Sequence, residues 1–176
     1  MKGKPFAWDR GVDYEKMYRK ILRHYKEAKR DTQKAYDIIL LTQLRNGSRI
    51  TEAIEFLKQI CEPKTFTRKK EVRVLKVRNR EVKRLMVLPK EIDKKELFRL
   101  SYIIKEAYKQ KVVNYARRTY GINTHSLRYA FITHLARKGI APQLIAKITG
   151  HQKLDFILHY TQQVKAEQIL ENVDEL

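Results

Sequence analysis

The chain has 176 residues, which is enough for one domain with a sizeable hydrophobic core. Lysine and arginine number 39 against 20 aspartate and glutamate, and the formal charge of +19 favours nucleic acid over an anionic membrane surface as the partner. No apolar run approaches the ~20 residues of a membrane span, no signal peptide is visible, and the single Cys61 excludes a disulfide framework. We expect a cytoplasmic, DNA-associated protein with no membrane partner.

Residues 1–12 carry glycine, proline and charge without periodicity, and we expect a flexible arm or a linker remnant there. Residues 13–176 are predicted to form one domain. Apolar residues recur at helical spacing within 14–25, 35–44 and 50–60, which predicts three helices. Ser48 can cap the third helix, and Cys61 reads as a small buried hydrophobe.

Residues 64–89 differ in character from the helices before them. The segments VRVLKV and VKRLMVL predict the two strands of an antiparallel β-hairpin at about 70–88. Ten lysines or arginines against two glutamates within 64–84 give a local charge of +8. A folded domain gains nothing by concentrating like charge, so this run favours contact with phosphate groups over a solvated surface. The predicted DNA-binding residues are Arg73, Arg78, Arg80 and Arg84.

The remaining chain is predicted to be helical. Apolar spacing indicates a long helix at 95–118, another at 126–138, a short helix from Pro142 to Gly150, and a helix that begins near Asp155. A last amphipathic helix at about 164–176 has a local charge of −3. The fold class is therefore mainly α with a small antiparallel β-sheet.

Four polar residues stand in a fixed order along this helical region, between positions 125 and 160. They are His125 and Arg128 in HSLR, His151 in TGHQ, and Tyr160 in HYT. Arg49, in NGSRITEA, is a second arginine far away in sequence. Two guanidinium groups can grip one phosphodiester because each is planar and stays charged. In phosphoryl transfer most of the catalysis comes from positioning the reactants and from neutralising charge on the non-bridging oxygens.

Tyr160 is predicted to be the nucleophile. A phenol is weakly nucleophilic at neutral pH, so its attack needs cationic surroundings or a nearby base. His125 and His151 can each donate to a phosphate oxygen or move a proton near neutral pH. No cluster of His, Cys and Asp has the spacing of metal ligands, and we expect catalysis without a metal or another cofactor.

This ordered set resembles the tyrosine recombinase (phage integrase) family, whose motif is Arg, Lys, His-x-x-Arg, Gly-His and Tyr. The resemblance covers residues from about 30 to 165 and implies the tyrosine recombinase catalytic-domain fold over 13–176. It also implies site-specific DNA recombination or integration. The tyrosine attacks a DNA phosphate, forms a 3′-phosphotyrosyl link and frees a 5′-hydroxyl that later reverses the step. Bond energy stays in the covalent intermediate, so neither ATP nor metal is required.

The resemblance assigns two supporting roles. An acidic residue supports the site three positions after the first arginine, and Glu52 holds that position one helical turn from Arg49. The lysine of the family lies on the β-hairpin and protonates the leaving 5′-oxygen. Lys76 on the first strand and Lys83 on the return strand both fit this role. The separation of Lys76 from Arg49 in the sequence suits the family and favours Lys76.

The family's usual amino-terminal DNA-binding domain has no room in this chain, so we expect either a catalytic fragment or a minimal recombinase. The acidic helix 164–176 could fold back on the basic body of its own chain. In related recombinases such a tail docks on a neighbouring protomer, so the resemblance implies self-association on double-stranded DNA, as a dimer or tetramer, through this helix. Two other functions stay open. One is a type IB topoisomerase, which the His-x-x-Arg and Gly-His pair disfavours, and the other is a catalytically silent DNA-binding protein of the same fold.

Overall fold

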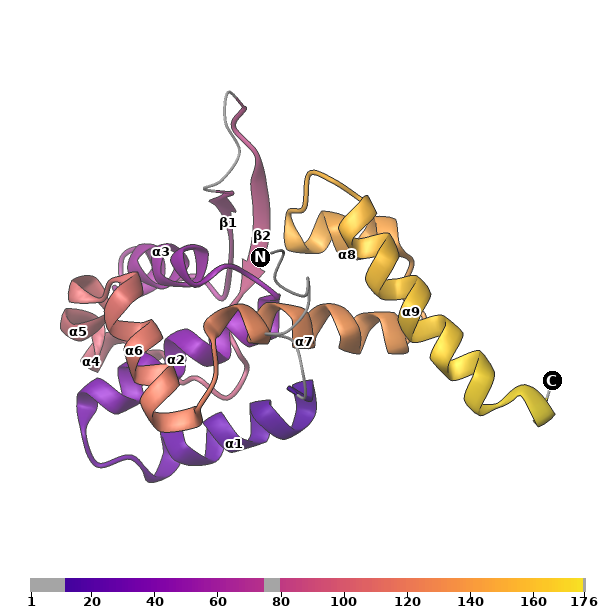
Figure 1. Ribbon diagram of the computed structural model, residues 1–176. Helices are drawn as coiled ribbons and strands as arrows, with labels where there is room; N and C mark the ends of the chain where they lie inside the picture. The colour runs from indigo at the N-terminus through magenta and orange to yellow at the C-terminus, as the bar shows by residue number, and fades with distance from the viewer. Residues whose placement is uncertain (1–11, 75–79, 176) are drawn as a thin grey trace, which may run out of the picture.

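The computed structural model describes residues 12–74 and 80–175 and is mainly helical, with one two-stranded antiparallel sheet (Figure 1). This confirms the predicted fold class. The strands are β1 (Lys69–Arg73) and β2 (Lys83–Val87). The helices are α1 (Tyr14–Glu27), α2 (Asp31–Asn46), α3 (Ile50–Ile60), α4 (Lys94–Arg99), α5 (Ser101–Glu106), α6 (Lys109–Tyr120), α7 (Thr124–Arg137), α8 (Pro142–Thr149), α9 (Asp155–Glu171) and the short 3₁₀ helix η1 (Val173–Glu175).

Helix α2 is the centre of the main core. Its residues from Ala35 to Leu44 are buried on every side, because α1, α3 and α7 all pack around it. It ends at Gly47, whose φ of 55° lies in the left-handed region that glycine adopts without strain. Cys61, at the end of α3, is fully buried, as predicted.

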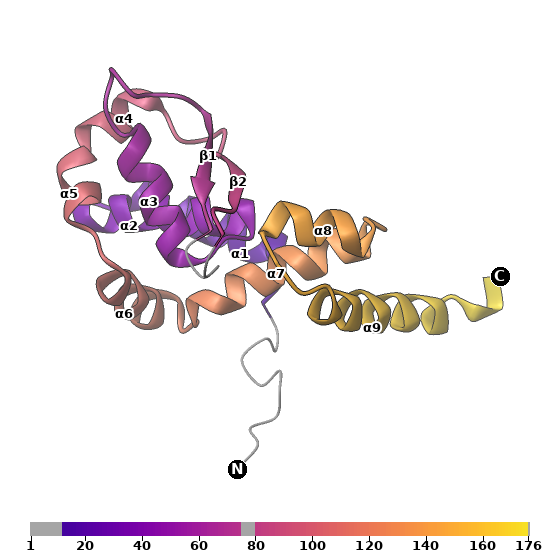
Figure 2. The same ribbon diagram turned by 90° about the horizontal axis from the view of Figure 1, so that it is seen from above.

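Helix α7 connects two separate apolar clusters. Leu127 and Ala130 belong to the main core, whereas Ile132 and Ala136 pack with α8 and α9 in a second, smaller cluster. Figures 1 and 2 both show α8 and α9 at the far end of α7, away from α3–α6. The residues predicted for the site come from both clusters and from the hairpin.

The hairpin presents one buried face. Val72 pairs with Arg84 across the sheet, and Met86 and Leu88 follow Arg84 at alternate positions on the same buried side. Strand β1 packs on α3 and β2 packs on α8. The predicted hairpin is thus present, while Lys76 and Arg78 lie outside the described residues.

Three predicted element boundaries were wrong. The helix expected at 95–118 is α4, α5 and α6, with breaks at the buried Leu100 and Ala107. The helices expected near Asp155 and at 164–176 form the single helix α9, which ends at Glu171. Arg49, not Ser48, is the capping residue of α3. In the part of the chain that the structure describes, no helix is long and apolar enough to cross a membrane.

Candidate active site

Arg49 and Glu52 form the first part of the site at the start of α3. The backbone N–H of Arg49 donates to Glu52 Oε2 at 2.8 Å, and Arg49 Nη1 donates to Oε1 at 3.1 Å. The Glu52 side chain is fully buried, whereas that of Arg49 is 19% exposed. The buried carboxylate therefore orients the guanidinium group from the protein interior, while part of the Arg49 side chain stays exposed to solvent.

Arg128 reaches the same place from α7. Its Nη1 donates to the carbonyl oxygens of Gly47 at 2.8 Å and Thr149 at 3.0 Å, and lies 3.9 Å from Glu52 Oε2. The residue is 3% exposed. Burial, with the nearby charge of Arg49, lowers the pKa of Arg128 to about 9, so the guanidinium still carries its charge at neutral pH.

His151 follows the positive-φ Gly150 that ends α8, and it faces Arg128. Arg128 Nη2 lies 3.1 Å from Nδ1 and 3.2 Å from Nε2 of the imidazole. Burial, with the charges of Arg128, Arg49 and Arg84, lowers the pKa of His151 to about 3. The ring is therefore neutral and accepts a hydrogen bond from Arg128, since a guanidinium can only donate.

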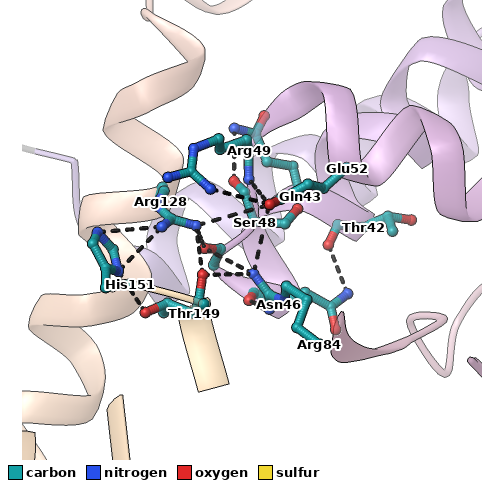
Figure 3. A network of polar contacts seen from close by, with 12 residues as sticks. Thr42, Gln43, Asn46, Ser48, Arg49, Glu52, Arg84, Arg128, Thr149 and His151 are labelled. Atoms are coloured by element: carbon teal, nitrogen blue, oxygen red, sulfur yellow. Dashed lines mark hydrogen bonds and ion pairs between the residues drawn. The ribbon is translucent and has the colours of Figure 1, made fainter. Parts of the chain in front are cut away.

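Arg84 corrects a prediction. It is predicted to bind DNA, but it is 3% exposed, and its side chain points from β2 into the polar network that includes Asn46 and Thr149 (Figure 3). It donates to the carbonyl oxygens of Asn46, Gly47 and Thr149. The sequence does not reveal this orientation, because residues 85–88 are all apolar; the structure shows that Arg84, Met86 and Leu88 share the buried face while Leu85 is exposed.

The other predicted residues lie around this cluster. His125 is exposed in the first turn of α7, and its backbone N–H donates to Asn123 Oδ1. Tyr160 lies in the second turn of α9. Lys83 is half-exposed and lies 3.5 Å from Glu81. Arg73 and Arg80, both predicted to bind DNA, are exposed on the hairpin.

The assembled cluster carries an excess of positive charge. Three guanidinium groups, those of Arg49, Arg84 and Arg128, surround the single carboxylate of Glu52 (Figure 3). The formal charge of the four groups is +2, and a bound phosphodiester would offset it. In residues 12–74 and 80–175, no group of three His, Cys, Asp or Glu side chains could hold a metal ion.

Comparison with known sequences gives a consistent set of relatives. A sequence model of the phage integrase family matches residues 14–167. An uncharacterized protein of Methanocaldococcus jannaschii is 34% identical, over 97% of this chain and 90% of its own length. A protein of Acidianus two-tailed virus, named as a putative integrase, is 37% identical over 93% of this chain and 68% of its own. A Sputnik virophage protein, also named as a putative integrase, is 29% identical over 94% of this chain and 89% of its own length.

One solved structure has a similar fold. The XerH site-specific recombinase, in a post-cleavage complex with its palindromic difH substrate, aligns with a TM-score of 0.64 at 16% identity. The match covers all of this chain and 56% of that chain, so this chain spans about half of the length of that recombinase. At this identity the likeness shows the fold, which agrees with the family that the sequences indicate.

Proposed function

The chain belongs to the phage integrase family of tyrosine recombinases, and we propose that it cleaves and rejoins DNA at specific sites through a 3′-phosphotyrosyl intermediate on Tyr160. The observation that carries this proposal is the convergence of Arg49, Arg128 and His151 around one buried carboxylate. These three residues come from distant parts of the chain. A scissile phosphate bound by both guanidinium groups would account for their meeting.

The chemistry exchanges one phosphodiester for another. The Tyr160 oxygen forms a bond to phosphorus, and the bond from phosphorus to the 5′-oxygen of DNA breaks. Arg49 and Arg128 would neutralise the non-bridging oxygens as charge builds on them. The phenol proton leaves to a base, with His125 and His151 as candidates, and the 5′-oxygen takes a proton from the hairpin lysine, Lys76 or Lys83.

Double-stranded DNA is the proposed partner. The related XerH recombinase is bound to its DNA substrate, and this chain carries a formal charge of +19. The exposed Arg73 and Arg80 on the hairpin would contact backbone phosphates beside the site. Binding that depends on such contacts weakens steeply as salt rises.

Self-association through the end of α9 is also proposed. Ile169, Leu170 and Val173 are exposed apolar side chains in an acidic segment, a pattern that fits an interface better than a solvated helix end. A second copy of this strongly basic chain is the proposed occupant, because its charge complements that of the segment.

Covalent trapping tests the proposed reaction. The protein is incubated with nicked duplexes from a pool of candidate sites, and an adduct that resists denaturant is measured for the wild-type protein and for Tyr160→Phe. We expect the adduct to disappear in the variant while DNA affinity stays within about twofold, because one hydroxyl contributes little to phosphate binding.

Other outcomes identify the alternatives. An adduct that persists in Tyr160→Phe would mean that another residue is the nucleophile. Relaxation of supercoiled plasmid without strand exchange would favour a topoisomerase. Tight binding to every DNA without any adduct would favour a silent DNA-binding protein.

A further inference from the structure

Arg84 is a charged residue in an unusual place. It lies on the inner face of β2, opposite Val72 and in line with Met86, and it is 3% exposed. Burying a charged side chain costs free energy unless hydrogen bonds and opposite charges compensate for it. Its partners therefore indicate what the residue does.

Those partners are the ends of two helices. Arg84 Nη2 donates to the Asn46 carbonyl oxygen, and Nη1 lies 3.5 Å from that of Gly47 and 3.2 Å from that of Thr149. Asn46 and Gly47 end α2, and Thr149 ends α8. The last carbonyl groups of a helix have no partner within it and carry partial negative charge, so a cation that bridges two such ends holds them together.

Arg128 uses two of the same acceptors. Its Nη1 donates to the carbonyl oxygens of Gly47 and Thr149, and both guanidinium groups lie within 3.9 Å of Glu52 Oε2. Figure 3 shows the side chains of Arg84, on β2, and Arg128, on α7, both directed toward Thr149. The position of Arg128 therefore depends on carbonyl groups that Arg84 also holds.

We propose that Arg84 is a positioning residue of the recombination site, which ties the loop before Arg49 to the turn before His151 and thereby orients Arg128. The proposal rests on the proposed recombinase function. In this role Arg84 acts through Arg128 and needs no contact of its own with DNA. Its planar fork fits three carbonyl groups in a way that the single ammonium of a lysine cannot.

The test compares two substitutions with a matched control. Arg84→Met removes the charge at similar length, and Arg84→Lys keeps the charge but removes the fork. Arg73→Met removes an exposed arginine from the neighbouring strand. For each variant, the rate of adduct formation at saturating DNA, the DNA affinity and its salt dependence are measured at a temperature where the variant is folded.

We expect both Arg84 variants to form adduct at least about tenfold more slowly at saturation, with affinity and salt dependence close to wild type. Arg73→Met should show the opposite pattern, in which the loss appears as weaker binding and a shallower salt slope rather than as a slower rate at saturation. Weaker, salt-dependent binding with a normal rate in the Arg84 variants would overturn the proposal and make Arg84 a DNA contact. A normal rate in Arg84→Lys would overturn the requirement for the fork.

A second readout does not need catalysis. Arg128 is the cation that lowers the pKa of His151 most, after burial. Arg84 is the weakest of the three cations that lower this pKa, and in Arg84→Lys the total charge is unchanged. A large rise of the His151 pKa in an NMR titration would therefore record displacement of Arg128. An unchanged pKa would overturn the positioning role. This result stands even if the wild-type protein forms no adduct and the recombinase proposal fails.

Discussion

At the scale of single residues, the site keeps a histidine neutral between cations. Thr149 Oγ1 lies 2.6 Å from His151 Nδ1, and the Phe156 ring stacks on the imidazole at 5.8 Å. These contacts shield the ring from water, and Arg128 opposes its protonation. A phosphodiester bound beside Arg128 would offset that charge and raise the proton affinity of His151 at the point where the proposed reaction needs it.

The depressed pKa of His151 predicts a pH dependence of stability. Its pKa falls from an ordinary 6.5 to about 3 on folding, so between these values the unfolded chain binds a proton that the folded chain excludes. Stability should therefore be complete above pH 6.5 and be lost as the pH falls toward 3. In His151→Gln this loss should be smaller by on the order of 2 kcal/mol at pH 4, after a discount for partial exposure.

Urea unfolding of both proteins at pH 7, 6, 5 and 4 gives the free energy of unfolding at each pH. The effect is the difference between the two proteins in how steeply this free energy falls with pH. A constant offset caused by the substitution does not matter, since only the change with pH is compared. Parallel curves for the two proteins would show that His151 titrates normally in the folded state.

At the scale of elements, the turn between α2 and α3 controls the site. A Cβ added to Gly47 would lie 2.1 Å from Cδ1 of the buried Phe131 ring, and its φ of 55° is strained for any other residue. We expect Gly47→Ala to cost about 2–4 kcal/mol of stability. It should also slow adduct formation, because the Gly47 carbonyl holds Arg128 and Arg84.

Gly121→Ala is the matched control. Gly121 has a φ of 67° at the end of α6, with nothing within 4 Å of an added Cβ, so only the backbone strain of ~1 kcal/mol applies. Urea denaturation of the two variants separates the strain from the clash. Equal losses of stability would mean that the Phe131 ring moves aside without cost.

The sequence predicted where helices and strands occur better than it predicted where the helices are interrupted. Leu100 and Ala107 interrupt the predicted helix 95–118 although neither is a helix breaker, because both are buried against the core and tertiary packing overrides local propensity. The two helices predicted at the carboxyl-terminal end are one helix in the structure. No glycine or proline separates Tyr160 from Val164, which favours the single helix α9.

The site was predictable in part. The order of residues in the sequence indicated Arg49, Glu52, Arg128 and His151, and these four meet in the structure. Arg84 was identified by its charge and assigned to the surface, because a count of charges does not reveal which face of a strand they occupy. The shared carbonyl acceptors were beyond prediction, since they depend on how the ends of α2 and α8 approach each other.

At the scale of the whole molecule, the polar site forms the seam between two apolar clusters. Arg128 lies on α7 between Leu127, in the main core, and Ile132, in the second cluster. Burial of Ile157 and Val164 fixes α9, and with it the backbone that carries Tyr160, to the second cluster. The relative placement of Arg128 and the α9 backbone at Tyr160 therefore depends on how the two clusters are held together, and Arg84 and Arg128 contribute to this through their shared contact with the Thr149 carbonyl.

The end of α9 should control assembly on DNA without affecting the fold. Leu170 is 75% exposed, so Leu170→Lys should change the stability of the monomer by less than ~0.5 kcal/mol. If a second basic chain covers this acidic, apolar segment, the substitution removes buried apolar area and adds a repelling charge. Sedimentation velocity on duplexes with two binding sites should then show fewer doubly bound complexes, while binding to one site stays normal.

Gln162→Lys adds the same charge at an exposed position of α9 without loss of apolar surface, and serves as the control. Equal assembly of both variants and the wild-type protein would mean that copies of this chain do not meet through the end of α9.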